Sequence, residues 1–202
     1  MKKTSIHNKI ETRIKEKGRG AIVFPSDFLD LGSTEVAKKV LLRLEHKGFL
    51  KRLAFGIYLY PKHSNLLGTL TPSLEEIAIA IADRDAARII PTGVYALNRL
   101  GLSTQVPLNA VYLTDGAARK IKVGNRTIVF KKTTPKNLAA VGPISSLVIQ
   151  ALKAIGEEKV ETYEEKKILE LLQKEKQINI KKDLMVAPEW IRKILRKAIN
   201  PE

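Results

Sequence analysis

One segment of the chain carries side chains suited to reading DNA. Thr34, Lys38, Lys39 and Arg43 recur at the spacing that places residues on one face of an α-helix. Lys and Arg on such a face can reach guanine acceptors or phosphates in the major groove, and Thr can bond a base or a phosphate. With Ser33, which caps the helix, they form the expected recognition-helix set. The alternative is an amphipathic helix whose basic face is only solvated.

A second basic pair follows in a segment rich in aromatic and β-branched residues. Lys51 and Arg52 could reach backbone phosphates or the minor groove beside that helix. Phe55 falls at the expected tip of a hairpin, where it could wedge into DNA or pack on a sugar; we expect it to fold back on the core. Lys2 and Lys3 could form a phosphate-binding arm or be merely solvated.

The elements that position these residues are those of a winged helix-turn-helix domain spanning residues 1–68. The third helix would be the recognition helix, and the hairpin turning at Gly56 would be the wing. The buried stripe of that helix is expected to hold Val36 or Ala37, then Val40, Leu41 and Leu44. A linker is expected at residues 62–71. In chain order we expect a helix from Ile6 to Gly18, a strand over 21–24, a short helix from Ser26 to about Gly32, a helix over 33–47 and a hairpin over 49–60.

Residues 69–202 are predicted to form a second, α+β domain with a small antiparallel sheet. Ser73 and Glu76 fit a capping box that begins a helix. Gly124–Asn125 is a plausible two-residue hairpin loop. Helices are expected over 73–87, 92–100, 143–155, 161–176 and 189–199, and strands over 110–114, 120–123 and 126–132.

The predicted hairpin of this second domain is also basic. Its cations could bind nucleic acid, whether flanking DNA or an RNA, or they could be the solvated face of a strand. The residues in question are Arg119, Lys120, Lys122, Arg126, Lys131 and Lys132.

Charge supports a polyanionic partner. The chain has 36 Lys and Arg against 21 Asp and Glu, a net charge of +15. Residues 1–68 hold 14 basic and 6 acidic residues, so the excess is densest at the N-terminus. Neutralising phosphates releases counterions, which supplies much of the affinity of DNA-binding proteins. A basic protein that is merely soluble is the alternative explanation.

Enzyme chemistry has little support in the sequence. The chain has no Cys, and His7, His46 and His63 lack metal-ligand spacing. Asp83 and Asp85 are two residues apart on a predicted helix, so they point to different faces, and we expect Arg84 and Arg88 to pair with them. We expect no catalytic residues, metal or cofactor. No apolar run is long enough to span a membrane, and the expected location is the cytoplasm.

Several stretches of the chain resemble a known family. They are Arg88–Leu97, Leu100–Pro107, Val111–Gly116 and Ile121–Ile128. Together with the predicted winged helix, they are similar to the AbiEi-type antitoxins, and more closely to a related group of uncharacterised bacterial proteins. The likeness covers most of residues 1–155. Phe55 departs from the basic wing tip that the resemblance leads us to expect.

The resemblance implies two activities. The winged helix would bind inverted repeats in double-stranded DNA at its own promoter and repress the operon. The C-terminal domain would counteract a nucleotidyltransferase-like toxin without forming a stable complex with it. The leading hypothesis is therefore a DNA-binding autorepressor and antitoxin of an abortive-infection type operon. The alternative is a winged-helix protein–protein interaction module that does not bind DNA.

Overall fold

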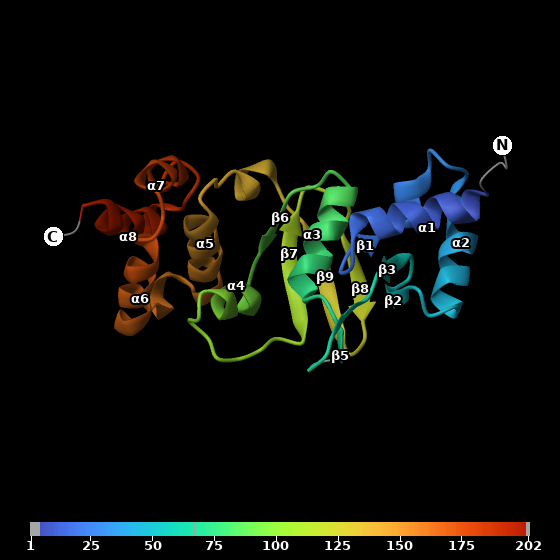
Figure 1. Cartoon of the computed structure of the whole chain (residues 1–202). Coiled ribbons are helices and arrows are strands. Elements are labelled where there is room, and N and C mark those ends of the chain that lie inside the picture. The colour runs from blue at the N-terminus through green and yellow to red at the C-terminus, as the bar shows by residue number, and fades with distance from the viewer. Residues whose placement is uncertain (1–4, 67, 201–202) are drawn as a thin grey trace. The chain divides into compact units, whose positions relative to one another are not determined.

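The computed structural model describes residues 5–66 and 68–200 and has mixed α+β architecture (Figure 1). It forms two compact units. The first comprises the N-terminal residues through Arg84 with Lys122–Asn125, and the second comprises Asp85–Ile121 with Arg126 and the residues that follow. The division falls after Arg84, so the helix that we expected to open the second domain groups with the N-terminal unit.

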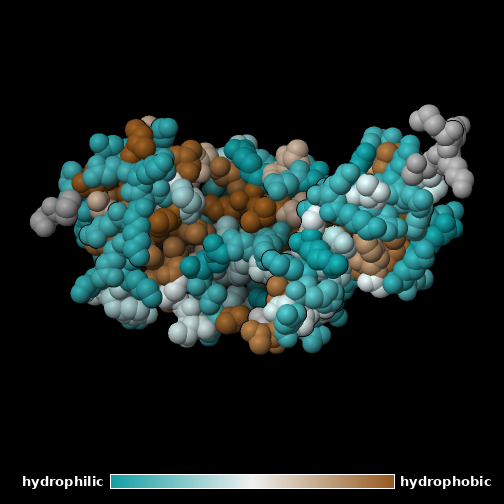
Figure 2. Space-filling model, in the orientation of Figure 1, coloured by the Kyte–Doolittle hydropathy of each residue, from teal (hydrophilic) through white to brown (hydrophobic). Residues whose placement is uncertain are grey.

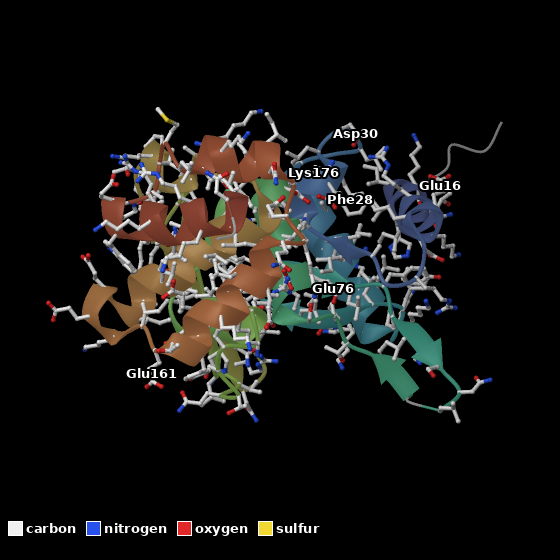
Figure 3. All side chains as sticks on the ribbon, turned by 90° about the vertical axis from the view of Figure 1, so that its left-hand side faces the viewer. Glu16, Phe28, Asp30, Glu76, Glu161 and Lys176 are labelled. Atoms are coloured by element: carbon white, nitrogen blue, oxygen red, sulfur yellow. The ribbon has the colours of Figure 1, made fainter. Side chains whose placement is uncertain are left out.

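The N-terminal unit packs helices against a small antiparallel sheet. Strand β3 lies between β1 and β2, and β2 and β3 form a hairpin. Buried Ile10, Ile14, Phe28, Leu41 and Leu44 join the elements into one core; Phe28 is labelled in Figure 3. In chain order the elements are α1 (Ile6–Lys17), β1 (Ile22–Val23), the 3₁₀ helix η1 (Pro25–Phe28), α2 (Thr34–His46), β2 (Lys51–Ala54) and β3 (Ile57–Leu59).

The short helix expected from Ser26 is a 3₁₀ turn, and its N-cap is Phe24 instead of Ser26. Pro25 occupies the first helical position, where its missing N–H costs nothing. The Asp27 carboxylate accepts a hydrogen bond from the Phe24 amide at 3.3 Å. The backbone then continues in turns before α2 begins.

Two further elements complete this unit. A hairpin of β4 (Lys62–Ser64) and β5 (Gly68–Leu70) occupies the segment that we expected to be a linker. Helix α3 (Leu74–Arg84) follows, and the predicted capping box is confirmed: the Ser73 amide donates to the Glu76 carboxylate at 2.7 Å, and the Glu76 amide donates to Ser73 Oγ at 3.1 Å. Hydrogen bonds from Ser73 hold the pKa of Glu76 below its usual range.

The second unit contains a four-stranded sheet of order β6-β7-β9-β8, except that the last two residues of β8 group with the first unit. The pair β6–β7 is antiparallel, and the two-residue connection between β8 and β9 requires an antiparallel hairpin. The central pair β7–β9 is parallel, which differs from the wholly antiparallel sheet that we expected. The strands are β6 (Ile89–Pro91), β7 (Asn109–Thr114), β8 (Arg119–Val123) and β9 (Arg126–Lys132).

Helices build the rest of the second unit around an apolar core. Val148, Leu152, Ile168, Ile191 and Leu195 are fully buried in it. The 161–176 helix that we predicted ends at Leu172, and a separate helix, unforeseen in the sequence, begins at Gln177. The elements are α4 (Val94–Arg99), η2 (Pro135–Leu138), α5 (Pro143–Ile155), η3 (Glu157–Lys159), α6 (Thr162–Leu172), α7 (Gln177–Asp183) and α8 (Glu189–Ile199).

Two buried carboxylates hold the N-terminus of α5. Asp183 accepts hydrogen bonds from the amides of Val141 at 2.7 Å and Gly142 at 3.0 Å, and Glu175 accepts one from the Ile144 amide at 2.8 Å. These amides have no partner within the helix, so the carboxylates from the α6–α7 region satisfy them. The interaction ties α7 to α5. Among residues 5–66 and 68–200, no helix combines the length and apolarity needed to cross a membrane.

Candidate nucleic-acid interface

Helix α2 is built to leave one basic face in solvent. The Ser33 hydroxyl accepts a hydrogen bond from the Val36 amide at 3.4 Å, which confirms the predicted N-cap. Ala37, Val40, Leu41 and Leu44 are buried in the core as expected. The opposite side of the helix exposes Ser33, Thr34, Lys38, Lys39, Leu42 and Arg43. The sequence therefore brings the whole recognition-helix set to one accessible surface.

Two of the cations on this surface form no ion pair within the described residues. Lys38 Nζ lies 2.8 Å from the Glu35 carboxylate, and this hydrogen bond lowers the pKa of Glu35. Within the described part of the chain, Lys39 and Arg43 form no ion pair. A phosphate approaching the helix would therefore meet two positive charges that are not held in ion pairs. On the face drawn in Figure 2, helices α1 and α2 are mostly hydrophilic, with hydrophobic residues showing below α1.

A groove separates the exposed face of α2 from the β2–β3 hairpin. Its cavity volume is about 230 Å³. Lysines from α2 and an arginine from β2 surround an apolar floor, so the groove combines positive charge with hydrophobic surface. The lining residues are Lys38, Lys39, Leu42, Arg52, Phe55, Gly56 and Tyr58.

A β-bulge in β2 changes the direction of the Arg52 side chain, which lines this groove. Ala54 pairs with Ile57, but Arg52 pairs with Tyr58, so β2 holds one extra residue, Leu53. In a regular hairpin Arg52 would lie opposite Leu59 instead. Bulges commonly re-aim a side chain in this way. Tyr58 was missed as a groove residue because the sequence gives no sign of the bulge.

Lys51 and Arg52 are both exposed and border one shallow hollow together, but only Arg52 also reaches the groove beside α2. Arg52 lines the groove with α2, whereas Lys51 pairs in register with Leu59 and does not line that groove. The expectation that Phe55 folds back on the core is wrong. Its side chain is 85% exposed, because the turn Phe55–Gly56 carries it away from the sheet and Gly56 adopts φ +69°. Lys2 and Lys3 lie outside the described residues.

The six cations of the four-stranded sheet do not gather on one of its faces. Side chains alternate between the faces of a strand. Arg119 lies over the Phe130 ring, 5.4 Å from its centre, on the core side of the sheet, and it also pairs with Asp85. Lys120 and Lys122 therefore point to the opposite side. By the same alternation Lys131 shares their side, while Arg126 and Lys132 share the side of Phe130.

Arg88, which we expected to pair with Asp83 or Asp85, pairs with another carboxylate. Asp85 pairs with Arg119, and Arg88 Nε lies 2.8 Å from the Asp115 carboxylate. Hydrogen bonds from the Arg88 side chain and amide lower the pKa of Asp115. Arg84 lies over the Phe24 ring, 4.6 Å from its centre. In residues 5–66 and 68–200 no three His, Asp or Glu side chains are grouped to hold a metal ion.

The chain matches a known family model over most of its length. A family model described as a family of unknown function, DUF6088, matches residues 9–180. The match covers both units and includes α2, the β2–β3 hairpin and the four-stranded sheet. The search of curated proteins found no match.

Proposed function

We propose that this protein, which belongs to the DUF6088 family, is a DNA-binding transcription regulator whose N-terminal unit is a winged helix-turn-helix. The proposal rests above all on the exposed basic face of α2, bordered by the β2–β3 hairpin. In it, α2 is the recognition helix and enters the major groove. The hairpin is the wing.

The order of elements supports a winged helix. Helix α1, strand β1, the η1 turn, helix α2 and the β2–β3 hairpin follow one another, and the sheet order is β1-β3-β2. In this arrangement η1 and the turn after it stand in for the first helix of the helix-turn-helix. Core residues such as Phe28 and Leu41 hold them against α2.

Charge supports DNA as the partner. Lys39 and Arg43 carry no ion pair within the described residues, and Arg52 borders the same groove. Uncompensated cations gain affinity for a duplex by releasing condensed counterions. The expected binding therefore weakens steeply as the salt concentration rises.

We further propose that the protein represses its own operon at an inverted repeat and serves there as an antitoxin. This part rests on the resemblance to the AbiEi-type antitoxins, which is carried by Arg88–Leu97, Leu100–Pro107, Val111–Gly116 and Ile121–Ile128. A nucleotidyltransferase-like toxin encoded next to this gene would support it. An antitoxin of this kind would relieve growth arrest by that toxin without co-purifying with it.

The experiment is a binding titration with the duplex from upstream of the protein's own coding sequence. The triple variant Lys38→Ala/Lys39→Ala/Arg43→Ala should lose binding, while its thermal unfolding stays close to that of the wild type, because all three side chains are exposed. Replacing the exposed Lys166, Lys174 and Lys181 by Ala removes the same charge from the second unit and serves as the matched control. Unimpaired binding by the α2 variant would reject α2 as the recognition helix.

A protein partner is the second candidate function. Leu42 and Phe55 are exposed in the same groove, which suits an acidic, apolar peptide as well as DNA. This candidate predicts stable capture of a defined partner by the wild type, loss of capture on Leu42→Ala, and no affinity for duplex DNA at low salt.

A further inference from the structure

We propose that the Phe55 ring makes an apolar contact in the minor groove of duplex DNA, next to the major groove that α2 enters. The inference rests on the proposed DNA-binding function and deepens it. It assigns an uncharged side chain to the interface, where the resemblance to the AbiEi-type antitoxins led us to expect a basic wing tip.

The first observation is the isolation of Phe55 from the core. The other apolar residues of the hairpin are buried, including Leu53, Ile57 and Leu59, whereas 85% of the Phe55 surface is accessible. The ring therefore contributes little to packing the unit. A lone exposed apolar residue is ordinary on a protein surface, so exposure alone does not identify a partner.

The second observation is the charge around the ring. The Arg52 guanidinium lies 5.5 Å from the centre of the Phe55 ring, and Arg52 Nε donates to the Ala54 carbonyl at 3.4 Å. The bulge at Leu53 is what brings Arg52 to this side of the hairpin. The tip thus presents a cation and an aromatic ring together, with Lys38 and Lys39 across the groove.

This combination complements the DNA backbone. Each nucleotide places an anionic phosphate beside an apolar deoxyribose, and the sugars line the walls of the minor groove. With α2 in the major groove, an adjacent hairpin lies over the neighbouring backbone and minor groove. Arg52 would then meet a phosphate, and Phe55 would reach the sugar edges. Apolar side chains are used in this way by proteins that bind the minor groove.

Salt dependence separates an apolar contact from a charged one. Phe55→Ala removes no charge, so it should weaken binding to the upstream duplex about tenfold or more without changing the slope of log affinity against log salt. Lys39→Ala should lower that slope by about one. Leu66→Ala is the matched control, since Leu66 is 94% exposed and does not line the groove. It should bind like the wild type.

Protection from dimethyl sulfate locates the contact. The reagent methylates guanine N7 in the major groove and adenine N3 in the minor groove. Wild-type protein should protect both kinds of site. Phe55→Ala, at concentrations that saturate the duplex, should lose protection at adenine N3 beside the α2 site and keep it at guanine N7. Phe55→Trp should keep both.

Three results would overturn the inference. One is that the Phe55→Ala variant binds the upstream duplex as tightly as the wild type. Another is that this variant still protects adenine N3 as the wild type does. The third is a fall in salt slope equal to that of Arg52→Ala, because Phe55 would then act only by positioning Arg52. Absence of guanine protection by the wild type would instead reject the proposed function, so the two failures are distinguishable.

Discussion

The Asp183 carboxylate accepts a hydrogen bond from the Ser145 hydroxyl at 2.5 Å, although 38 residues separate them in the chain. Asp183 is fully buried, and its other hydrogen bonds come from the amides that precede α5. Three donors satisfy the hydrogen-bonding capacity that burial takes from this carboxylate. The contact therefore fastens the C-terminal helices to the start of α5.

Asp183→Ala should destabilise the second unit by about 3 kcal/mol, because it leaves two amides and a hydroxyl buried without an acceptor. Asp183→Asn should cost less, since one oxygen remains. Trp190 is the only tryptophan of the chain and packs against the helical core. Its fluorescence during urea unfolding measures the loss, and a midpoint equal to that of the wild type would contradict this role of Asp183.

Low pH should destabilise the same helical region, because it protonates the Glu175 carboxylate. Burial raises the pKa of this carboxyl, but hydrogen bonds from Asn179 and from the Ile144 and Lys176 amides outweigh it and leave the pKa lowered. A carboxyl with a lowered folded pKa stabilises the protein above its unfolded pKa, about 4.3. That stability is lost as the pH falls through the folded pKa.

The measurement is the Trp190 urea midpoint at a series of pH values from 7 down to about 3. Glu175→Gln should lower the midpoint at pH 7 and flatten its fall below about pH 5. Glu158→Gln, on the exposed surface of η3, should keep the wild-type profile. An unaltered pH profile for Glu175→Gln would show that other carboxyls govern the acid response.

Gly142 should not tolerate a side chain. A methyl group at this position would overlap Ser145 Oγ and lie 2.9 Å from the Glu175 carboxylate. Gly142→Ala should therefore cost about 1–3 kcal/mol, the usual range for overpacking. Gly32→Ala is the control, because its new methyl group would meet Ile6 and Val36 at an ordinary 3.6 Å. Equal stability of both variants would refute the tight approach at residue 142.

The cap of α2 offers a way to separate stability from DNA binding. Ser33→Ala should destabilise the N-terminal unit by about 1 kcal/mol and leave the Trp190 transition unchanged. Ser33→Asp keeps a capping oxygen, so helix stability should be retained, but its charge should repel phosphates and weaken binding to the upstream duplex. Thermal unfolding followed by circular dichroism and the binding titration give the two readings. Tighter binding by Ser33→Asp would argue against a phosphate near this end of α2.

Local signals predicted much of the fold. Pro143 and Gly156 bound an apolar helix whose limits match α5, and α8 also spans the predicted residues. The Gly124–Asn125 turn lies between the two predicted strands. The exposed face of α2 followed from its periodicity. These features depend on residues a few positions apart, and the sequence displays them directly.

Features set by distant residues escaped prediction. The parallel pairing of β7 with β9 depends on β8 lying at the sheet edge, which no local pattern encodes. Helix α7 is polar and short, so its periodicity is weak, and Glu175 and Asp183 gain their roles only through amides more than 30 residues away. The direction of the Arg52 side chain follows from a single extra residue in β2, and the exposure of Phe55 follows from its place in the turn.

The strand order also constrains how the second unit assembles. After β7 the chain runs to the outer position of β8, turns at Gly124–Asn125, and only then enters the inner position as β9. Closing a two-residue turn costs less entropy than closing the longer loop back to β7. The β8–β9 hairpin is therefore free to form first and to dock on β7 as a finished piece. A substitution that slows the docking of this hairpin on β7 would therefore slow formation of the whole four-stranded sheet.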